Sequence, residues 1–211
     1  MKVIIGYGTG RCGTQSLARF LNNQNGCDIT HEKVELNWQP AFSDVQEAIN
    51  GLFRRTSPII GDVGFFWIHY LTHILREVKD AKAINIWRED EAVIESFWSY
   101  MKKEVQNFQH NQWKGYPFDS PFQTKDAIAK SVMRYRFLEH GVSRIYPYSI
   151  YKIHTNDLND KDKMEEMLNW LGIKDMNLKT FHSNTSKSIL AKQKPFAKYV
   201  NPFPGFTRRL Q

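Results

Sequence analysis

Residues 6–16 read GYGTGRCGTQS, a glycine-rich stretch that stands between an apolar run and an amphipathic segment. Residues 2–8, which overlap the start of this stretch, have the composition of a buried strand. Residues 15–23, which overlap its end, place apolar side chains at helical spacing. A strand that passes through a glycine turn into a helix presents backbone N–H groups at the helix N-terminus, where the helix dipole adds positive charge. The stretch therefore predicts an anion-binding loop. Its candidate contacts are Gly10, Arg11, Cys12, Gly13, Thr14, Gln15 and Ser16.

Short apolar runs alternate with helical patterns along the rest of the chain, which is typical of a parallel α/β sheet. Further strands are expected at residues 27–30, 58–64, 81–87 and 148–154. Further helices are expected at residues 90–103, 125–141 and 160–172, with glycine stops at Gly141 and Gly172. These elements predict an α/β fold of three layers, in which a central parallel β-sheet of about five strands is flanked by helices, as in P-loop NTPases.

The loop differs from that of nucleotide triphosphatases, which reads G-x-x-x-x-G-K-[ST]. Gly8 and Gly13 have the required spacing, but Thr14 stands where the lysine should be. In triphosphatases that lysine reaches the β- and γ-phosphates. The substitution weakens a P-loop kinase or nucleotidase interpretation, which stays open as the alternative enzyme class.

Cys12 suggests a second alternative, the cysteine nucleophile of a phosphatase, whose loop reads C-x5-R. Ala18 stands six residues after Cys12 and Arg19 is one position too far, so the pattern excludes this class. We expect Cys12 to be a small loop residue, with a pKa that the helix dipole can lower.

The chain carries 29 Lys and Arg against 22 Asp and Glu, a net charge of +7, which favours anionic partners. The basic residues are scattered and match no nucleic-acid-binding pattern, so nucleic acid is not an expected partner. With no apolar run of 18 residues and no secretory signal, we expect a cytoplasmic protein without membrane association.

GTGRCGTQSL, residues 8–17, resembles the 5′-phosphosulfate loop of the sulfotransferases, whose pattern is roughly P-[KR]-S-G-T-T-x-L. The matching positions are Arg11, Gly13, Thr14 and Leu17, and the departures are Cys12 and Gln15. Both departures leave the backbone donors in place. The resemblance implies 3′-phosphoadenosine 5′-phosphosulfate (PAPS) as donor, adenosine 3′,5′-bisphosphate (PAP) as product, and no metal.

INIWREDEAVIESFWSYMKK, residues 84–103, resembles the second motif of that family, a strand that ends in Arg and is followed eight residues later by a helical Ser. In the family this pair binds the 3′-phosphate of the donor, which implies the same role for Arg88 and Ser96. The placement agrees, because ligands of α/β proteins bind at the carboxyl ends of strands. A tail at residues 182–199 resembles the segment that closes over the 3′-phosphate, and its candidate contacts are Ser186 and Lys187.

Sulfuryl transfer needs groups that neutralise the transferred oxygens and a base that removes the acceptor's proton. Arg11 and the loop amides suit the first role. In sulfotransferases that act on carbohydrates, a glutamate often stands roughly twenty residues past the basic loop residue, and Glu32 fits that spacing. Asp62 is the second candidate, as base or positioning group, and His31 is expected to orient Glu32 or the acceptor.

Two segments rich in aromatic residues follow no period, residues 104–124 and residues 180–211. We expect the first to be a lid on the acceptor side and the second a tail that closes over the cofactor, within a single domain that spans residues 1–211. The candidate wall of the acceptor site is Phe108, Trp113, Tyr116 and Phe118.

The sequence thus predicts a metal-independent sulfotransferase, monomeric or homodimeric, which transfers the sulfuryl group of PAPS to a hydroxyl of a carbohydrate or small molecule. Besides the kinase or nucleotidase alternative, a nucleotide- or polyanion-binding module without catalytic activity stays open.

Overall fold

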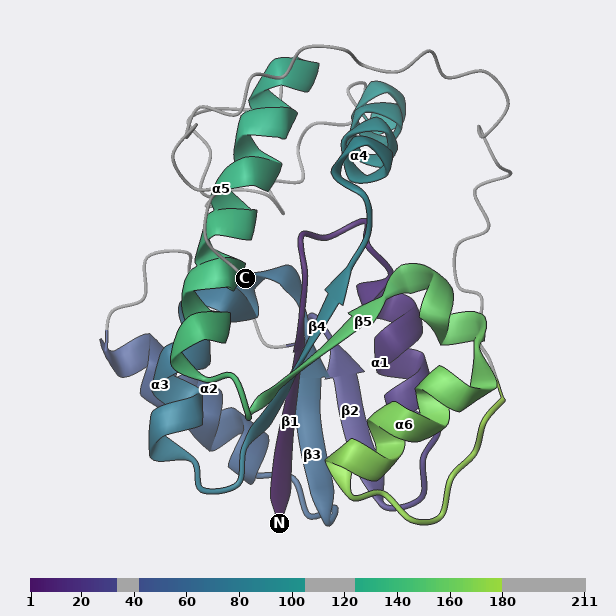
Figure 1. Ribbon diagram of the computed structural model, residues 1–211. Helices are drawn as coiled ribbons and strands as arrows, with labels where there is room; N and C mark the ends of the chain where they lie inside the picture. Colours follow the sequence, from purple (N-terminus) through teal and green to yellow (C-terminus); the bar gives the residue numbers. More distant parts are fainter. Residues whose placement is uncertain (34–41, 105–123, 180–211) are drawn as a thin grey trace, which may run out of the picture.

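The computed structural model describes residues 1–33, 42–104 and 124–179, which form a five-stranded parallel sheet and the helices around it (Figure 1). The strands are β1 (Lys2–Tyr7), β2 (Cys27–His31), β3 (Ile59–Val63), β4 (Lys82–Trp87) and β5 (Ile150–His154). Their order across the sheet is β2-β3-β1-β4-β5, and every neighbouring pair is parallel. Because β1 is central, the loop that follows it opens at the middle of the carboxyl edge, between β3 and β4.

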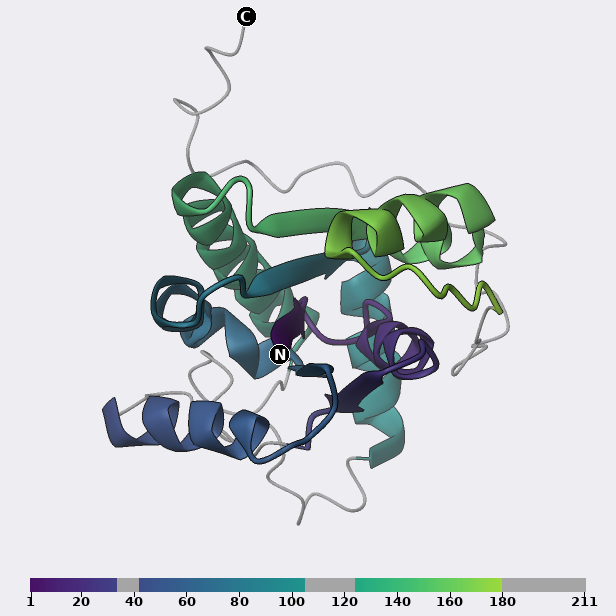
Figure 2. The same ribbon diagram turned by 90° about the horizontal axis from the view of Figure 1, so that it is seen from below.

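Helices cover both faces of this sheet and make a structure of three layers (Figures 1 and 2). The helices are α1 (Thr14–Asn22), α2 (Phe42–Phe53), α3 (Leu71–Glu77), α4 (Asp90–Glu104), α5 (Lys125–Ile145) and α6 (Lys161–Leu171). The 3-10 helices η1 (Phe65–His69) and η3 (Thr155–Asn159) follow β3 and β5. Helices α1 and α6 lie on one face, and α2, α3 and α5 lie on the other. The predicted fold class is confirmed.

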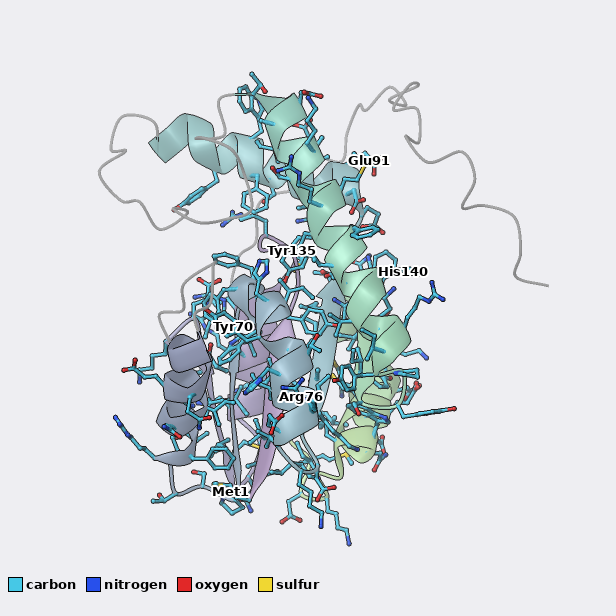
Figure 3. The ribbon with its side chains drawn as sticks, turned by 90° about the vertical axis from the view of Figure 1, so that its left-hand side faces the viewer. Met1, Tyr70, Arg76, Glu91, Tyr135 and His140 are labelled. Carbon is cyan, nitrogen blue, oxygen red and sulfur yellow. The ribbon has the colours of Figure 1, made fainter. Side chains whose placement is uncertain are left out.

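Helix α5 extends past the carboxyl edge of the sheet and packs against α4 there (Figure 3). Tyr135 of α5 is buried and connects this helix to η1, because the Tyr135 hydroxyl donates to the backbone oxygen of Phe65 at 2.7 Å. The two helices therefore rise above the loop that follows β1, next to the edge where a ligand is expected.

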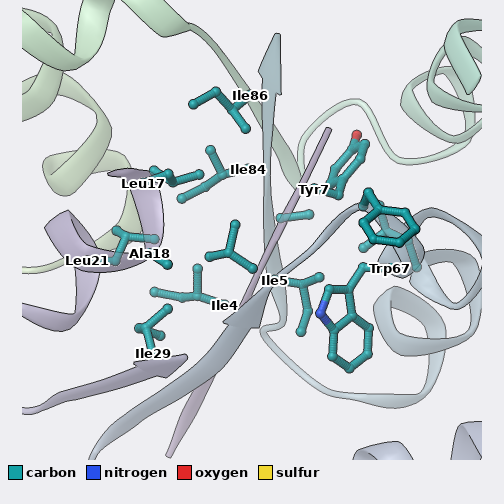
Figure 4. Close-up of a cluster of buried hydrophobic side chains, with 14 of the residues drawn as sticks. Ile4, Ile5, Tyr7, Leu17, Ala18, Leu21, Ile29, Trp67, Ile84 and Ile86 are labelled. Carbon is teal, nitrogen blue, oxygen red and sulfur yellow. The ribbon is translucent and has the colours of Figure 1, made fainter. Parts of the chain in front are cut away.

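The core explains why the strand runs are apolar throughout instead of alternating. Successive side chains of a strand point to opposite faces, and here both faces are covered. Ile4 lies toward Leu17 and Leu21 of α1, whereas Ile5 lies toward Trp67 of η1 (Figure 4). All five side chains are fully buried, and burial stabilises the fold by about 1.5–3 kcal/mol for each large apolar side chain.

The predicted end of the helix at residues 125–141 is wrong, because α5 continues through Gly141 to Ile145. Glycine in a helix costs only about 1 kcal/mol relative to alanine. Burial of Val142 in the last turn offsets this cost, as does the hydroxyl of Tyr146, directly after the helix, which donates to the backbone oxygen of Thr72 at 3.1 Å. The predicted end at Gly172 is confirmed, since Gly172 follows α6 with a left-handed φ of 73°.

Several expectations lie outside the residues described here. Of the acceptor-side lid predicted at 104–124, the structure describes only residues 104 and 124. The tail predicted at 180–211 lies wholly outside the described residues. The single domain stays a prediction. Across the described ranges, none of the helices combines the length and the apolar character that crossing a membrane requires.

We expect Gly61→Ala and Gly141→Ala to change stability in opposite directions. Gly61 pairs with Ile4 and Ile29, and a Cβ on it would lie 1.9 Å from the backbone oxygen of Ile4. Forcing it in should lower the free energy of unfolding by about 1–3 kcal/mol. A Cβ on Gly141 would meet nothing within 4 Å, so this helical substitution should raise the free energy by about 0.5–1 kcal/mol. Urea unfolding measures both, and a neutral Gly61→Ala would contradict the close approach of β1 and β3.

Candidate functional site

The connection from β1 to α1 is a tight loop at the carboxyl edge, next to the start of α4 (Figure 1). Gly10, Arg11 and Gly13 have left-handed φ angles of 68°, 53° and 100°. A Cβ on Gly8 would lie 2.2 Å from the backbone oxygen of Ile86, so the loop presses directly against β4. Gly13 supplies no side chain to cap α1, and the first turn of α1 has no acidic residue. The N-terminus of α1 therefore keeps its positive end for an external anion.

Arg11 reaches across this loop to α4. Its Nε donates to Oγ of Ser96 at 3.2 Å, and its guanidinium lies 4.8 Å from the ring centre of Tyr100, one turn further along the helix. Burial lowers the pKa of Arg11 from its ordinary value, and the positive charge of Arg88 acts in the same direction. An anion placed among these groups would relieve that repulsion.

Arg88 points back over the loop from the carboxyl end of β4. Its Nη1 donates to the backbone oxygen of Arg11 at 3.4 Å. Arg11, Arg88 and Ser96, which belong to two motifs far apart in the sequence, are thus brought together at one edge of the sheet. Two guanidinium groups and a hydroxyl so arranged can bind an oxyanion by charge-assisted hydrogen bonds.

Cys12 is held inside the loop. Its side chain is fully buried, and burial raises the pKa of the thiol to about 11. The expectation that the helix dipole can lower this pKa is therefore wrong, because desolvation outweighs the dipole. The Oγ1 of Thr155 lies within hydrogen-bond distance of the backbone oxygen of Cys12 and, at 2.9 Å, of that of Trp87. Cys12 contributes to the loop through its backbone and its packing.

Thr14 and His31 connect the loop to β2. Thr14 is buried at the first position of α1, and its Oγ1 lies 3.1 Å from Nε2 of His31, the last residue of β2. Burial lowers the pKa of His31, and Arg19 lowers it further, so the ring is neutral at pH 7. His31 was expected to orient Glu32 or the acceptor. Its nearer contact is Thr14, while Oε1 of Glu32 lies 3.9 Å away. Gln15 and Ser16 follow in the same turn and are half-buried.

Glu32 follows β2 in a left-handed conformation with a φ of 49°. Its backbone N–H donates to the oxygen of Val63 at 3.0 Å, so the pairing with β3 continues one residue past β2. The side chain is 34% exposed. Burial of the carboxyl and the nearby Asp62 carboxylate raise the pKa of Glu32 to about 7. A carboxylate with this pKa, still reached by solvent, is suited to accept a proton near neutral pH.

Asp62 is fully buried in β3, and its carboxylate accepts three hydrogen bonds. The donors are the hydroxyl of Thr30, Nε1 of Trp67 at 2.8 Å and the backbone N–H of Lys33 at 3.3 Å. Burial raises the pKa of Asp62, while these donors oppose the shift. The carboxylate is surrounded by protein groups, which distinguishes it from the partly exposed Glu32.

Sequence reasoning missed three residues at this site, Tyr100, Thr155 and Arg136. Tyr100 stands four positions after Ser96, so helical periodicity places both on one face. Thr155 directly follows a predicted strand, as Arg88 does. Arg136 carries no comparable signal, because its contacts with the β4–α4 junction, at Arg88 and Asp90, are with residues far away in the sequence. The predicted acceptor wall and the candidates Ser186 and Lys187 fall outside the described residues.

Comparison with known proteins establishes the fold. The structure of a sulfotransferase from Alicyclobacillus acidocaldarius matches with a TM-score of 0.58 and 12% identity over 85% of each chain. The mouse sulfotransferase SULT7A1 in complex with PAP matches with a TM-score of 0.53 and 12% identity over 83% of this chain and 59% of that chain. A shikimate kinase from Bacteroides thetaiotaomicron has a TM-score of 0.45 and 9% identity over 81% of this chain and 95% of that chain.

No protein-family model matches the sequence, and neither does any curated protein. At identities this low, the comparisons show that the chain has the fold seen in sulfotransferases. Its chemistry has to be argued from the residues of the site.

We expect Glu32→Gln to stabilise the protein above neutral pH. Since folding raises the pKa of this carboxyl from 4.5 to about 7, the folded state binds more protons than the unfolded state between these values. The stability of the unchanged protein therefore falls as pH rises through that window. The neutral amide escapes the penalty, although solvent screens part of it at a side chain that is 34% exposed.

Urea unfolding at pH 4.5, 6 and 8 measures the effect, and the advantage of Glu32→Gln should grow with pH. Glu165→Gln on the exposed side of α6 is the matched control and should show no such trend. An advantage that is constant across pH would contradict the raised pKa.

Proposed function

We propose that the protein is a sulfotransferase that moves the sulfuryl group of PAPS to an acceptor hydroxyl and releases PAP. The observation that carries this proposal is the meeting of Arg11, Arg88 and Ser96 beside the glycine loop. A donor with anionic groups at both ends of an adenosine needs two neighbouring oxyanion subsites. The loop with the N-terminus of α1 offers one of them, and the β4–α4 junction offers the other. The presence of PAP in the SULT7A1 structure supports this donor for a chain of the same fold.

The two subsites divide the donor between them. The loop amides, the first turn of α1 and Arg11 would bind the 5′-phosphosulfate, with Thr14 held toward the loop by His31. Arg88 and Ser96 would bind the 3′-phosphate, which is the group that distinguishes this donor from ATP. Ser186 and Lys187 remain proposed contacts of the tail.

In the transfer step, the acceptor oxygen attacks sulfur, and the bond between sulfur and the bridging oxygen of the 5′-phosphate breaks. The electron pair of that bond goes to the phosphate of PAP, where Arg11 and the loop amides would stabilise the negative charge. Glu32 would take the proton of the acceptor hydroxyl, because its pKa of about 7 suits a general base. Asp62, held by three donors, would position this edge and raise the basicity of Glu32 by repulsion. No step requires a metal.

The acceptor is proposed as a carbohydrate or small molecule, since a glutamate base is common among sulfotransferases that act on sugars. The alternative enzyme, a P-loop kinase or nucleotidase, is disfavoured by Thr14 in the lysine position and by its contact with His31. A binding module without catalysis would keep the oxyanion subsites and need no base.

Nucleotide binding separates the first two classes. We expect PAP to bind at least tenfold more tightly than ATP with magnesium, because Arg88 and Ser96 have a 3′-phosphate to contact only in PAP. Arg88→Ala should weaken PAP binding about tenfold or more and leave AMP binding unchanged. Isothermal titration calorimetry measures these affinities. Tighter binding of ATP with magnesium would overturn the sulfotransferase proposal.

Variants of Arg11 and of Glu32 should lose different functions, donor binding in the first case and turnover in the second. We expect Arg11→Ala to weaken PAP binding about 10–100-fold through loss of charge-assisted contacts. Arg11→Gly, which relaxes the left-handed backbone, should lose as much, so charge rather than strain is tested. Glu32→Ala should keep PAP binding and lower kcat about 10²–10⁴-fold.

Turnover of labelled PAPS measures the catalytic part, with kcat/KM of the unchanged protein rising with pH through about 7 as Glu32 loses its proton. The rise should vanish in Glu32→Ala. Full turnover by Glu32→Ala would show that another group is the base.

A further inference from the structure

Arg136, in the middle of α5, uses its guanidinium in three hydrogen bonds. Its Nη2 donates to the backbone oxygen of Arg88 at 2.6 Å, and its Nε donates to Oδ1 of Asp90 at 2.8 Å. Its Nη1 donates to Oε2 of Glu139 at 2.8 Å. One guanidinium thus joins α5 to the end of β4 and to the first residue of α4, and Figure 3 shows the two helices beside each other, with Glu91 on α4 and His140 on α5.

Glu139 anchors this guanidinium in the interior. Its side chain is only 5% exposed, and its Oε1 accepts from Nδ2 of Asn85, a fully buried residue of β4, at 2.8 Å. Burial disfavours the charged form of Arg136, but the carboxylates of Glu139 and Asp90 outweigh it and raise the pKa of Arg136. Arg136 is therefore a fixed cation, held on one side by α5 and β4 and bonded on the other side to the β4–α4 junction.

Two of the hydrogen bonds of Arg136 are made to the β4–α4 junction, which carries the second proposed oxyanion subsite. The oxygen it holds belongs to Arg88, and the Arg88 side chain extends from the same residue to the loop. Asp90 is the first residue of α4, and Ser96 of the same helix accepts the hydrogen bond from Arg11. Releasing this guanidinium would free both Arg88 and the start of α4, while Cys12 keeps its contact with Thr155 and Thr14 keeps its contact with His31.

We propose that Arg136 is the positioning residue of the 3′-phosphate subsite, which sets the preference of the protein for nucleotides that carry a 3′-phosphate. This inference rests on the proposed function. It assigns to α5 a part in donor selection. A lysine cannot replace the guanidinium, because one ammonium cannot reach three oxygens in the planar arrangement that arginine offers.

The test compares PAP with AMP, which lacks only the 3′-phosphate. Arg136→Lys keeps the charge beside Glu139 and should lower the ratio of the AMP and PAP dissociation constants about tenfold, with AMP binding unchanged within about twofold. Arg144→Lys, an exposed arginine near the end of the same helix, is the matched control and should keep the ratio of the unchanged protein. Isothermal titration calorimetry measures both ligands.

The ratio is insensitive to partial unfolding, since loss of folded protein affects both nucleotides alike. If Arg136→Lys does not fold, the double variant Arg136→Met/Glu139→Gln removes both charges together and leaves an amide for Asn85, and the same loss of preference is expected. An unchanged ratio, or an equal loss for both nucleotides, would overturn the positioning role. A ratio near one in the unchanged protein would instead overturn the proposed function, so the two failures are distinguishable.

Discussion

The bond between Arg11 and Ser96 joins the two halves on which the rest of the site depends. It ties the loop after β1 to helix α4, which follows the neighbouring strand β4. Arg88 reaches the same loop from the end of β4. Two cations are held close together there, and their repulsion contributes to the lowered pKa of Arg11. Partly buried positive charges held this close together are costly, and an anion bound among them would offset that cost.

The opposite side of the loop has the reverse chemistry. There Glu32 directly follows β2 and Asp62 stands one residue before the end of β3, and burial of Glu32 together with the Asp62 carboxylate favours the protonated form of Glu32. Neutral His31 stands between them and the loop, with Thr14 as its nearer contact. A side with two guanidinium groups and a side with two carboxylates therefore flank one glycine turn, and the strand order β2-β3-β1-β4 produces this arrangement.

Most of the sheet was predictable from sequence because strands buried on both faces are short, continuous apolar runs. The prediction missed one helix and ended another too early. Helix α2 has no counterpart among the expected elements, and α5 continues through Gly141 because Val142 is buried beyond it. At the site, Arg11 and Arg88 were found through motif spacing. Arg136 was not, since its bond to Arg88 spans 48 positions and leaves no local pattern.

The sequence by itself determined the strand–loop–helix unit and the residue types that surround it, because glycine spacing and apolar periodicity are local properties of the chain. The tertiary structure alone decided how those residues behave. Cys12 and Glu32 both stand near the loop, and folding turns the first into an inert thiol with a pKa of about 11 and the second into a carboxyl with a pKa of about 7. Desolvation and through-space charge produce these shifts, and both depend on which distant segments the fold brings into contact.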